Sequence, residues 1–122
     1  MQTLRLAEGE YRFATLVWEN EPLPSGKLVA LAAEALGWKK STTYTVLKKL
    51  CDRGILQNRD GVVTALVKQQ AVQQEESAAV VDKTFGGSLP RFVAAFLNTK
   101  PISEKEAAEI RAILDAAQRE KE

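Results

Sequence analysis

The sequence predicts a mainly α-helical protein: an N-terminal winged helix-turn-helix of three helices and a two-stranded β-ribbon, followed by a C-terminal region of three helices. Three observations support this prediction. Apolar residues recur at helical spacing in six segments, two short β-prone runs flank Asp60-Gly61, and basic residues concentrate in the third helix and the ribbon. The expected domains are residues 1–68, the winged-helix domain, and residues 69–122, the helical region.

Three helices are expected before the ribbon. The first carries Phe13 and Val17 at helical spacing and ends before Pro22, because proline disfavours helix in the residue before it. The second spans about Ser25 to Leu36, with Gly37 as its C-terminal cap. The third spans Lys40 to Arg53 and has an apolar and a polar side at 100° per residue. Its apolar side holds Thr43, Val46, Leu47 and Leu50, and its polar side holds Ser41, Tyr44, Thr45, Lys48, Lys49 and Asp52.

The ribbon and the C-terminal helices follow from turn and cap signals. Residues 55–58 and 62–67 are β-prone runs joined by Arg59-Asp60-Gly61, which is typical of a tight hairpin. Beyond residue 68 we expect a long helix that ends at Gly86-Gly87. Ser88 is the expected cap of a fifth helix, and Ser103 with Glu106 forms a capping box for a sixth.

Composition argues against an enzyme. The chain has 122 residues, a formal net charge of +1, one cysteine and no histidine. The missing histidine excludes Cys-His, Ser-His and His-metal catalysis, and no glycine-rich phosphate loop is visible. We therefore expect no catalytic site, no metal and no cofactor. The start MQTLRLAEGEYRF lacks the basic region and apolar run of a signal peptide, and no apolar stretch approaches the ~20 residues that span a bilayer. A cytoplasmic location is therefore expected.

The distribution of charge points to DNA. Six basic residues and one acidic residue lie between Trp38 and Arg59. In a winged helix-turn-helix the third helix enters the major groove, where amines can bind phosphates and hydroxyls can bind phosphates or base edges. The candidate DNA-binding residues are Lys39, Lys40, Ser41, Thr42, Tyr44, Thr45, Lys48, Lys49 and Arg59. In the alternative interpretation, these lysines and Arg59 are only solvated, and the chain is a protein-interaction module without specific DNA binding.

Two nearby side chains have a structural interpretation. Trp38 is expected to pack against the second and third helices rather than to face DNA. Cys51 is expected to be a buried structural thiol rather than a redox sensor.

The C-terminal helices carry more apolar surface than one chain can cover, so they predict a homodimer that matches a palindromic operator. The alternative is a monomer in which the last two helices fold back on the winged domain. The candidate dimerisation residues are Phe85, Leu89, Phe92, Val93, Phe96, Leu97, Ile110, Ile113 and Leu114.

Four segments carry a family resemblance: EYRFATLVW from residue 10, GWKKSTTYTVLKKLCDRGIL from residue 37, FGGSLPRFVAAFL from residue 85 and ISEKEAAEI from residue 102. The chain resembles the penicillinase repressor family (BlaI/MecI/CopY) of bacterial transcriptional regulators. The resemblance implies a homodimeric repressor of genes for β-lactam resistance or copper handling. It also implies that the recognition-helix contacts fall on residues 40–42, 44, 45, 48 and 49.

The sequence departs from this family in three places. No cysteine follows Lys100, so copper sensing through paired cysteines is not expected. A membrane sensor protease, the further partner that the resemblance implies, commonly cuts at Asn-Phe in the fifth helix, where this chain has Ala95-Phe96. Ala7 stands where relatives often have a helix-capping Ser, Thr or Asp.

Overall fold

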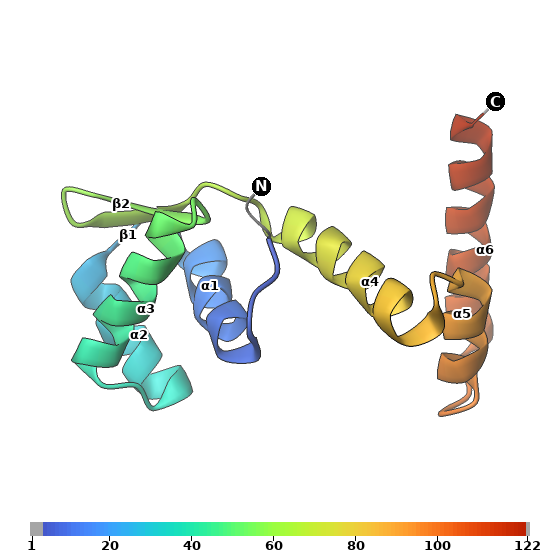
Figure 1. Ribbon diagram of the computed structural model, residues 1–122, viewed down its shortest axis with the longest axis horizontal. Helices are drawn as coiled ribbons and strands as arrows, with labels where there is room; N and C mark the ends of the chain where they lie inside the picture. Colours follow the sequence, from blue (N-terminus) through green and yellow to red (C-terminus); the bar gives the residue numbers. More distant parts are fainter. Residues whose placement is uncertain (1–3, 122) are drawn as a thin grey trace. The chain divides into compact units, whose positions relative to one another are not determined.

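The computed structural model describes residues 4–121 and divides into two compact units, one through Ala79 and one from Val80. In chain order the elements are α1 (Glu8–Asn20), β1 (Leu23–Pro24), α2 (Ser25–Leu36), α3 (Lys40–Asp52), β2 (Leu56–Arg59), β3 (Val62–Ala65), α4 (Gln69–Phe85), α5 (Leu89–Leu97) and α6 (Glu104–Glu120) (Figure 1). The expected domain boundary at residues 68/69 falls directly before α4. That helix begins in the first unit and ends in the second.

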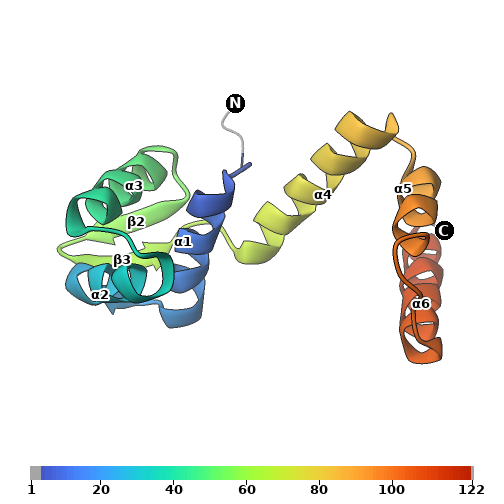
Figure 2. The ribbon, with the colours of Figure 1, turned by 90° about the horizontal axis from the view of Figure 1, so that it is seen from below.

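The first unit combines α1, α2 and α3 with a small antiparallel sheet (Figure 2). The strand order of this sheet is β1-β3-β2. The hairpin of β2 and β3 is confirmed, and its turn at Asp60 and Gly61 has φ angles of 54° and 82°. Two successive positive φ angles give a turn whose twist matches the strands it joins. The sheet thus presents β2 and its turn as the wing of the fold.

A third strand, β1, was not expected from the sequence. Leu23 pairs with Val63, and the backbone amide of Ser25 donates to Gly61 O at 2.8 Å. The two prolines near this strand suit an edge position, because an edge strand does not need every amide for the ladder. The ribbon is therefore part of a three-stranded sheet.

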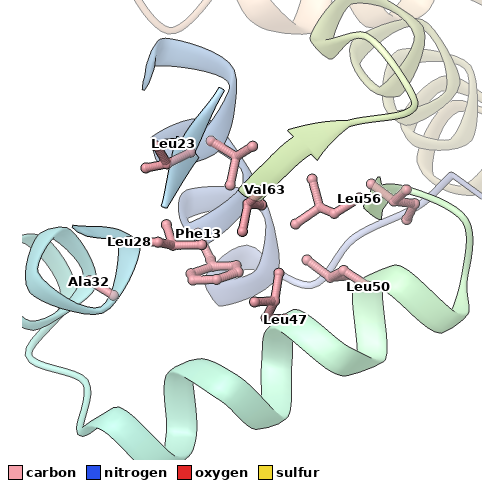
Figure 3. Close-up of a cluster of buried hydrophobic side chains, with 10 residues drawn as sticks. Phe13, Leu23, Leu28, Ala32, Leu47, Leu50, Leu56 and Val63 are labelled. Atoms are coloured by element: carbon pink, nitrogen blue, oxygen red, sulfur yellow. The ribbon is translucent and has the colours of Figure 1, made fainter. Parts of the chain in front are cut away.

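The core of the first unit draws on all three helices and all three strands (Figure 3). Its fully buried members include Phe13 of α1, Leu28 of α2, Leu50 of α3 and Val63 of β3. Trp38 has the expected packing role, but its ring stacks on Phe13 of α1, with ring centroids 5.4 Å apart. This core fixes α3 along one side and leaves its opposite side to solvent.

The helix ends follow the predicted capping signals, except at the start of α1, where a different hydrogen bond replaces the capping side chain. Gly37 ends α2 at φ 70°, and the hydroxyls of Ser88 and Ser103 accept hydrogen bonds from the amides of Arg91 and Glu106. Ala7 offers no capping side chain to α1. Instead the amide of Ala7 donates to Oε1 of Glu10 at 2.8 Å. A side chain in the first turn of α1 thus supplies the acceptor that this free amide needs.

The second unit consists of the end of α4 with α5 and α6, and no residue of α5 or α6 is buried. Phe85 and Phe92 pack edge to face with ring centroids 5.4 Å apart. Neither α4, α5, α6 nor any other described helix is long and apolar enough to cross a membrane.

Candidate nucleic-acid interface

The outer face of α3 carries most of the predicted contact residues. Thr43, Leu47 and Leu50 are buried against the core on the opposite side of the helix. Because side chains three and four residues apart share a face, this burial turns the residues between them outward. The exposed residues on and beside that outer face are Lys39, Lys40, Ser41, Thr42, Tyr44, Thr45, Lys48 and Lys49.

Local hydrogen bonds hold two of these side chains. Oγ1 of Thr45 donates to Ser41 O at 2.9 Å, which leaves the oxygen lone pairs and the methyl group of Thr45 available. The hydroxyl of Tyr44 lies 3.2 Å from Oγ of Ser25, at the start of α2. Tyr44 is thereby tied to a neighbouring helix while its ring stays partly exposed.

The two lysines near the end of α3 have different partners. Nζ of Lys48 lies 3.1 Å from Oδ2 of Asp52, and these side chains are 78% and 66% exposed. Nζ of Lys49, whose side chain is 62% exposed, lies 2.9 Å from Oε2 of Glu10, whose side chain is only 11% exposed. Exposed i,i+4 ion pairs contribute little and exchange readily with other partners, whereas a carboxylate shielded from water holds its cation more firmly.

A shallow hollow of about 350 Å³ lies beside the outer face of α3, between this helix and the wing strand β2. It is lined by Tyr44, Leu47, Lys48, Cys51 and Asn58. Cys51 is a free thiol that is half-buried rather than fully buried as expected. Burial and the charge of Asp52 raise the pKa of Cys51 against a backbone hydrogen bond from Asn58, so the thiol stays protonated and unreactive at neutral pH.

The wing offers one exposed cation. Arg59 is the last residue of β2, directly before the Asp60-Gly61 turn, and its side chain is exposed. The predicted contact residues thus come from α3, from the residue before it, and from the wing. Residues 4–121 contain no group of three His, Cys, Asp or Glu side chains that could hold a metal ion.

The predicted dimerisation residues all lie in the second unit. Phe85 and Phe92 are partly buried against each other. The others are exposed, with Phe96 at 47% and Ile113 at 67%. The predicted cleavage pair, Ala95 and Phe96, lies within α5 and is exposed in the single chain.

Comparison with known proteins decides the family. The family model described as "Penicillinase repressor" matches residues 6–116. The chain belongs to the penicillinase repressor family. Membership classes it among DNA-binding transcriptional repressors, as the resemblance in its sequence implied.

Relatives of this family match over nearly the whole chain. The methicillin resistance regulatory protein MecI of Staphylococcus aureus strain Mu50 is 20% identical over 118 residues, covering 93% of this chain and 96% of MecI. The penicillinase repressor of Bacillus licheniformis is 20% identical over 115 residues, covering 91% and 90% of the two chains. The solution structure of the DNA-binding domain of the repressor BlaI matches with a TM-score of 0.51 at 18% identity, over 57% of this chain and 90% of that domain. This structural match confirms the winged-helix fold of the first unit.

Proposed function

We propose that the chain is a repressor that binds a palindromic operator as a homodimer, with α3 in the major groove and the wing beside it. The observation that carries this proposal is the outer face of α3. Its hydroxyls and amines are exposed, while its inner face is fixed by the core of the first unit. A helix held in this way presents a defined pattern of donors to base edges and phosphates.

Each exposed residue type has a separate task in this proposal. Lys39, Lys40 and Lys48 neutralise phosphates, and Arg59 reaches a phosphate or the minor groove from the wing. The hydroxyls of residues 41, 42 and 45 bond phosphate oxygens or base edges, and the threonine methyl groups contact thymine. Lys49 is paired with Glu10 instead.

The homodimer is supported by the apolar side chains of the second unit. Burying one large apolar side chain stabilises an assembly by about 1.5–3 kcal/mol. A two-fold axis applies every contact twice, so a few such side chains suffice for a stable pair. Two linked winged-helix units would then bind two half-sites.

The experiment measures binding of the purified chain to the DNA upstream of its own gene over a range of salt concentrations. Each phosphate contact contributes about 0.9 to the slope of log K against log salt. Lys48→Gln should therefore reduce the slope by about 0.9 on operator and non-operator duplexes alike. The control Lys105→Gln removes an exposed charge from the second unit and should leave the slope unchanged.

A chain that shows no salt-dependent duplex binding would contradict the proposal. That outcome would favour the alternative of a protein-interaction module. Equal slopes for the wild type and Lys48→Gln would remove Lys48 from the phosphate contacts while leaving DNA binding itself in place.

A further inference from the structure

Glu10 joins the start of α1 to the end of α3. Its Oε2 lies 2.9 Å from Nζ of Lys49, and its Oε1 lies 3.4 Å from Nη1 of Arg53. The same Oε1 accepts the amide hydrogen bond of Ala7 at 2.8 Å. Nη2 of Arg53 in turn donates to the carbonyl of Arg5 at 2.6 Å. Three residues from two distant segments are thus held around one carboxylate that is nearly buried, and Arg53 also holds the backbone at Arg5.

These contacts make Glu10 a fixed partner. Its side chain is shielded from water and held by a backbone amide, so it cannot follow a cation that moves away. If Lys49 left for a DNA phosphate, the carboxylate would keep the Ala7 amide and, as its charged partner, only the longer contact with Arg53. Lys48 faces no such constraint, because its partner Asp52 is itself largely exposed and lies on the same helix.

Position on α3 separates the two lysines further. Consecutive residues of a helix are rotated by about 100° about its axis, so Lys48 and Lys49 point in clearly different directions. Lys48 shares its direction with Ser41 and Thr45, which are seven and three residues earlier. Lys49 instead points to the side on which Glu10 of α1 lies.

We propose that Glu10 is a positioning residue that retains Lys49 in an intramolecular ion pair, so that Lys49 makes no phosphate contact and the end of α3 is fastened to α1. This proposal rests on the proposed DNA-binding function. It removes Lys49 from the contact set implied by the sequence. Its consequence concerns specificity, since each cation that reaches a phosphate adds affinity for every sequence, and a withheld cation keeps non-specific binding low.

The test compares four variants of the full-length chain on an operator duplex and on a duplex of random sequence. Lys49→Gln should leave the salt slope unchanged on both, whereas its neighbour Lys48→Gln should lower it by about 0.9. Glu10→Gln keeps an acceptor for the Ala7 amide but releases the lysine. It should raise the slope on random DNA by about 0.9, and adding Lys49→Gln to it should cancel that rise.

The outcomes separate this proposal from the one on which it rests. A loss of about 0.9 in slope for Lys49→Gln alone would overturn it, because Lys49 would then be a phosphate contact in the wild type. Absence of salt-dependent binding by the wild type would instead overturn the proposed function. If Glu10→Gln fails to fold, the comparison of Lys49→Gln with Lys48→Gln still shows whether Lys49 contacts a phosphate in the wild type.

Discussion

At the scale of single residues, Glu10 should make stability depend on pH. Burial raises the pKa of Glu10, but the hydrogen bonds from Lys49 and the Ala7 amide and the charges of Lys49 and Arg53 together lower it below its ordinary value. A carboxyl whose pKa is lower in the folded chain stabilises the fold above its unfolded pKa, about 4.3. That contribution is lost as the pH falls through the folded value.

We therefore expect Glu10→Gln to lower the free energy of unfolding at neutral pH by about 1.5–3 kcal/mol, the range for hydrogen bonds to charged groups. The difference from the wild type should shrink as the pH falls below about 4.3. Urea unfolding followed by circular dichroism measures the free energy of unfolding at pH 7 and at acidic pH. Glu19→Gln, at an exposed position, is the control and should change this free energy little at either pH. A Glu10→Gln deficit that persists at acidic pH would show that packing, not charge, is responsible.

The sequence predicted which residues of α3 face outward, but it did not reveal Glu10. Helical periodicity is local, so the burial of Thr43 and Leu47 and the exposure of Ser41 and Lys48 follow from spacing alone. The contacts of Glu10 with Lys49 and Arg53 span 39 and 43 residues. No local pattern encodes such a pairing, and it arises only when the core brings α1 and α3 together.

At the scale of elements, β1 was not predicted because its pairing, too, depends on residues far away in the sequence. A two-residue strand that follows Pro22 and contains Pro24 has no alternation to detect, and Leu23 becomes a strand residue only because β3 offers it a partner. The hairpin of β2 and β3 was visible because its signal is local. Asp60-Gly61 requires positive φ angles, which few other residue pairs accept.

The wing turn gives a prediction at this scale. Gly61 has φ 82°, and a Cβ added there would meet no atom within 4 Å. Gly61→Ala should therefore act through backbone strain alone and destabilise the chain by about 1–2 kcal/mol. Gly26→Ala in α2 also adds a methyl group to open space, but without a positive φ, so stability should be unchanged or higher. Thermal unfolding compares the two, and equal effects would contradict the turn geometry.

At the scale of the whole molecule, the two units differ in how many side chains they bury. Among residues 4–121, every buried side chain lies between Phe13 and Val72, within the first unit. The second unit leaves Leu89, Phe96 and Ile113 exposed. The sequence indicated this surplus of apolar surface, since the last two helices carry apolar stripes and, even with the long helix before them, have too little mutual surface to close a core.

Phe96→Asp tests whether a second copy covers this surface. A charge placed in a two-fold interface is buried twice, so we expect monomers and much weaker operator binding. Ala108→Asp adds the same charge on the side of α6 opposite Ile110 and Leu114 and should leave the dimer intact. Sedimentation at micromolar concentration measures the state of each variant. A wild-type chain that sediments as a monomer would contradict the homodimer.

The last prediction concerns relief of repression by a cut in α5, the site that the family resemblance assigns to a sensor protease. Ending the chain after Ala95 imitates a cut between Ala95 and Phe96 and removes α6 from each subunit. All buried side chains of the described chain precede this point, so the winged-helix unit should remain folded. Two half-sites linked through a dimer bind more tightly than either alone, and losing the link costs on the order of 10²–10⁴ in affinity.

The truncated chain should therefore sediment as a monomer, bind a half-operator as the full-length chain does, and lose affinity for the full operator by that factor of about 10²–10⁴. Circular dichroism checks that the shortened chain is folded. Full-operator affinity that survives the truncation would mean that α6 is not needed for the dimer. A cut in α5 could then not release the DNA, and induction would have to act on the winged-helix unit itself.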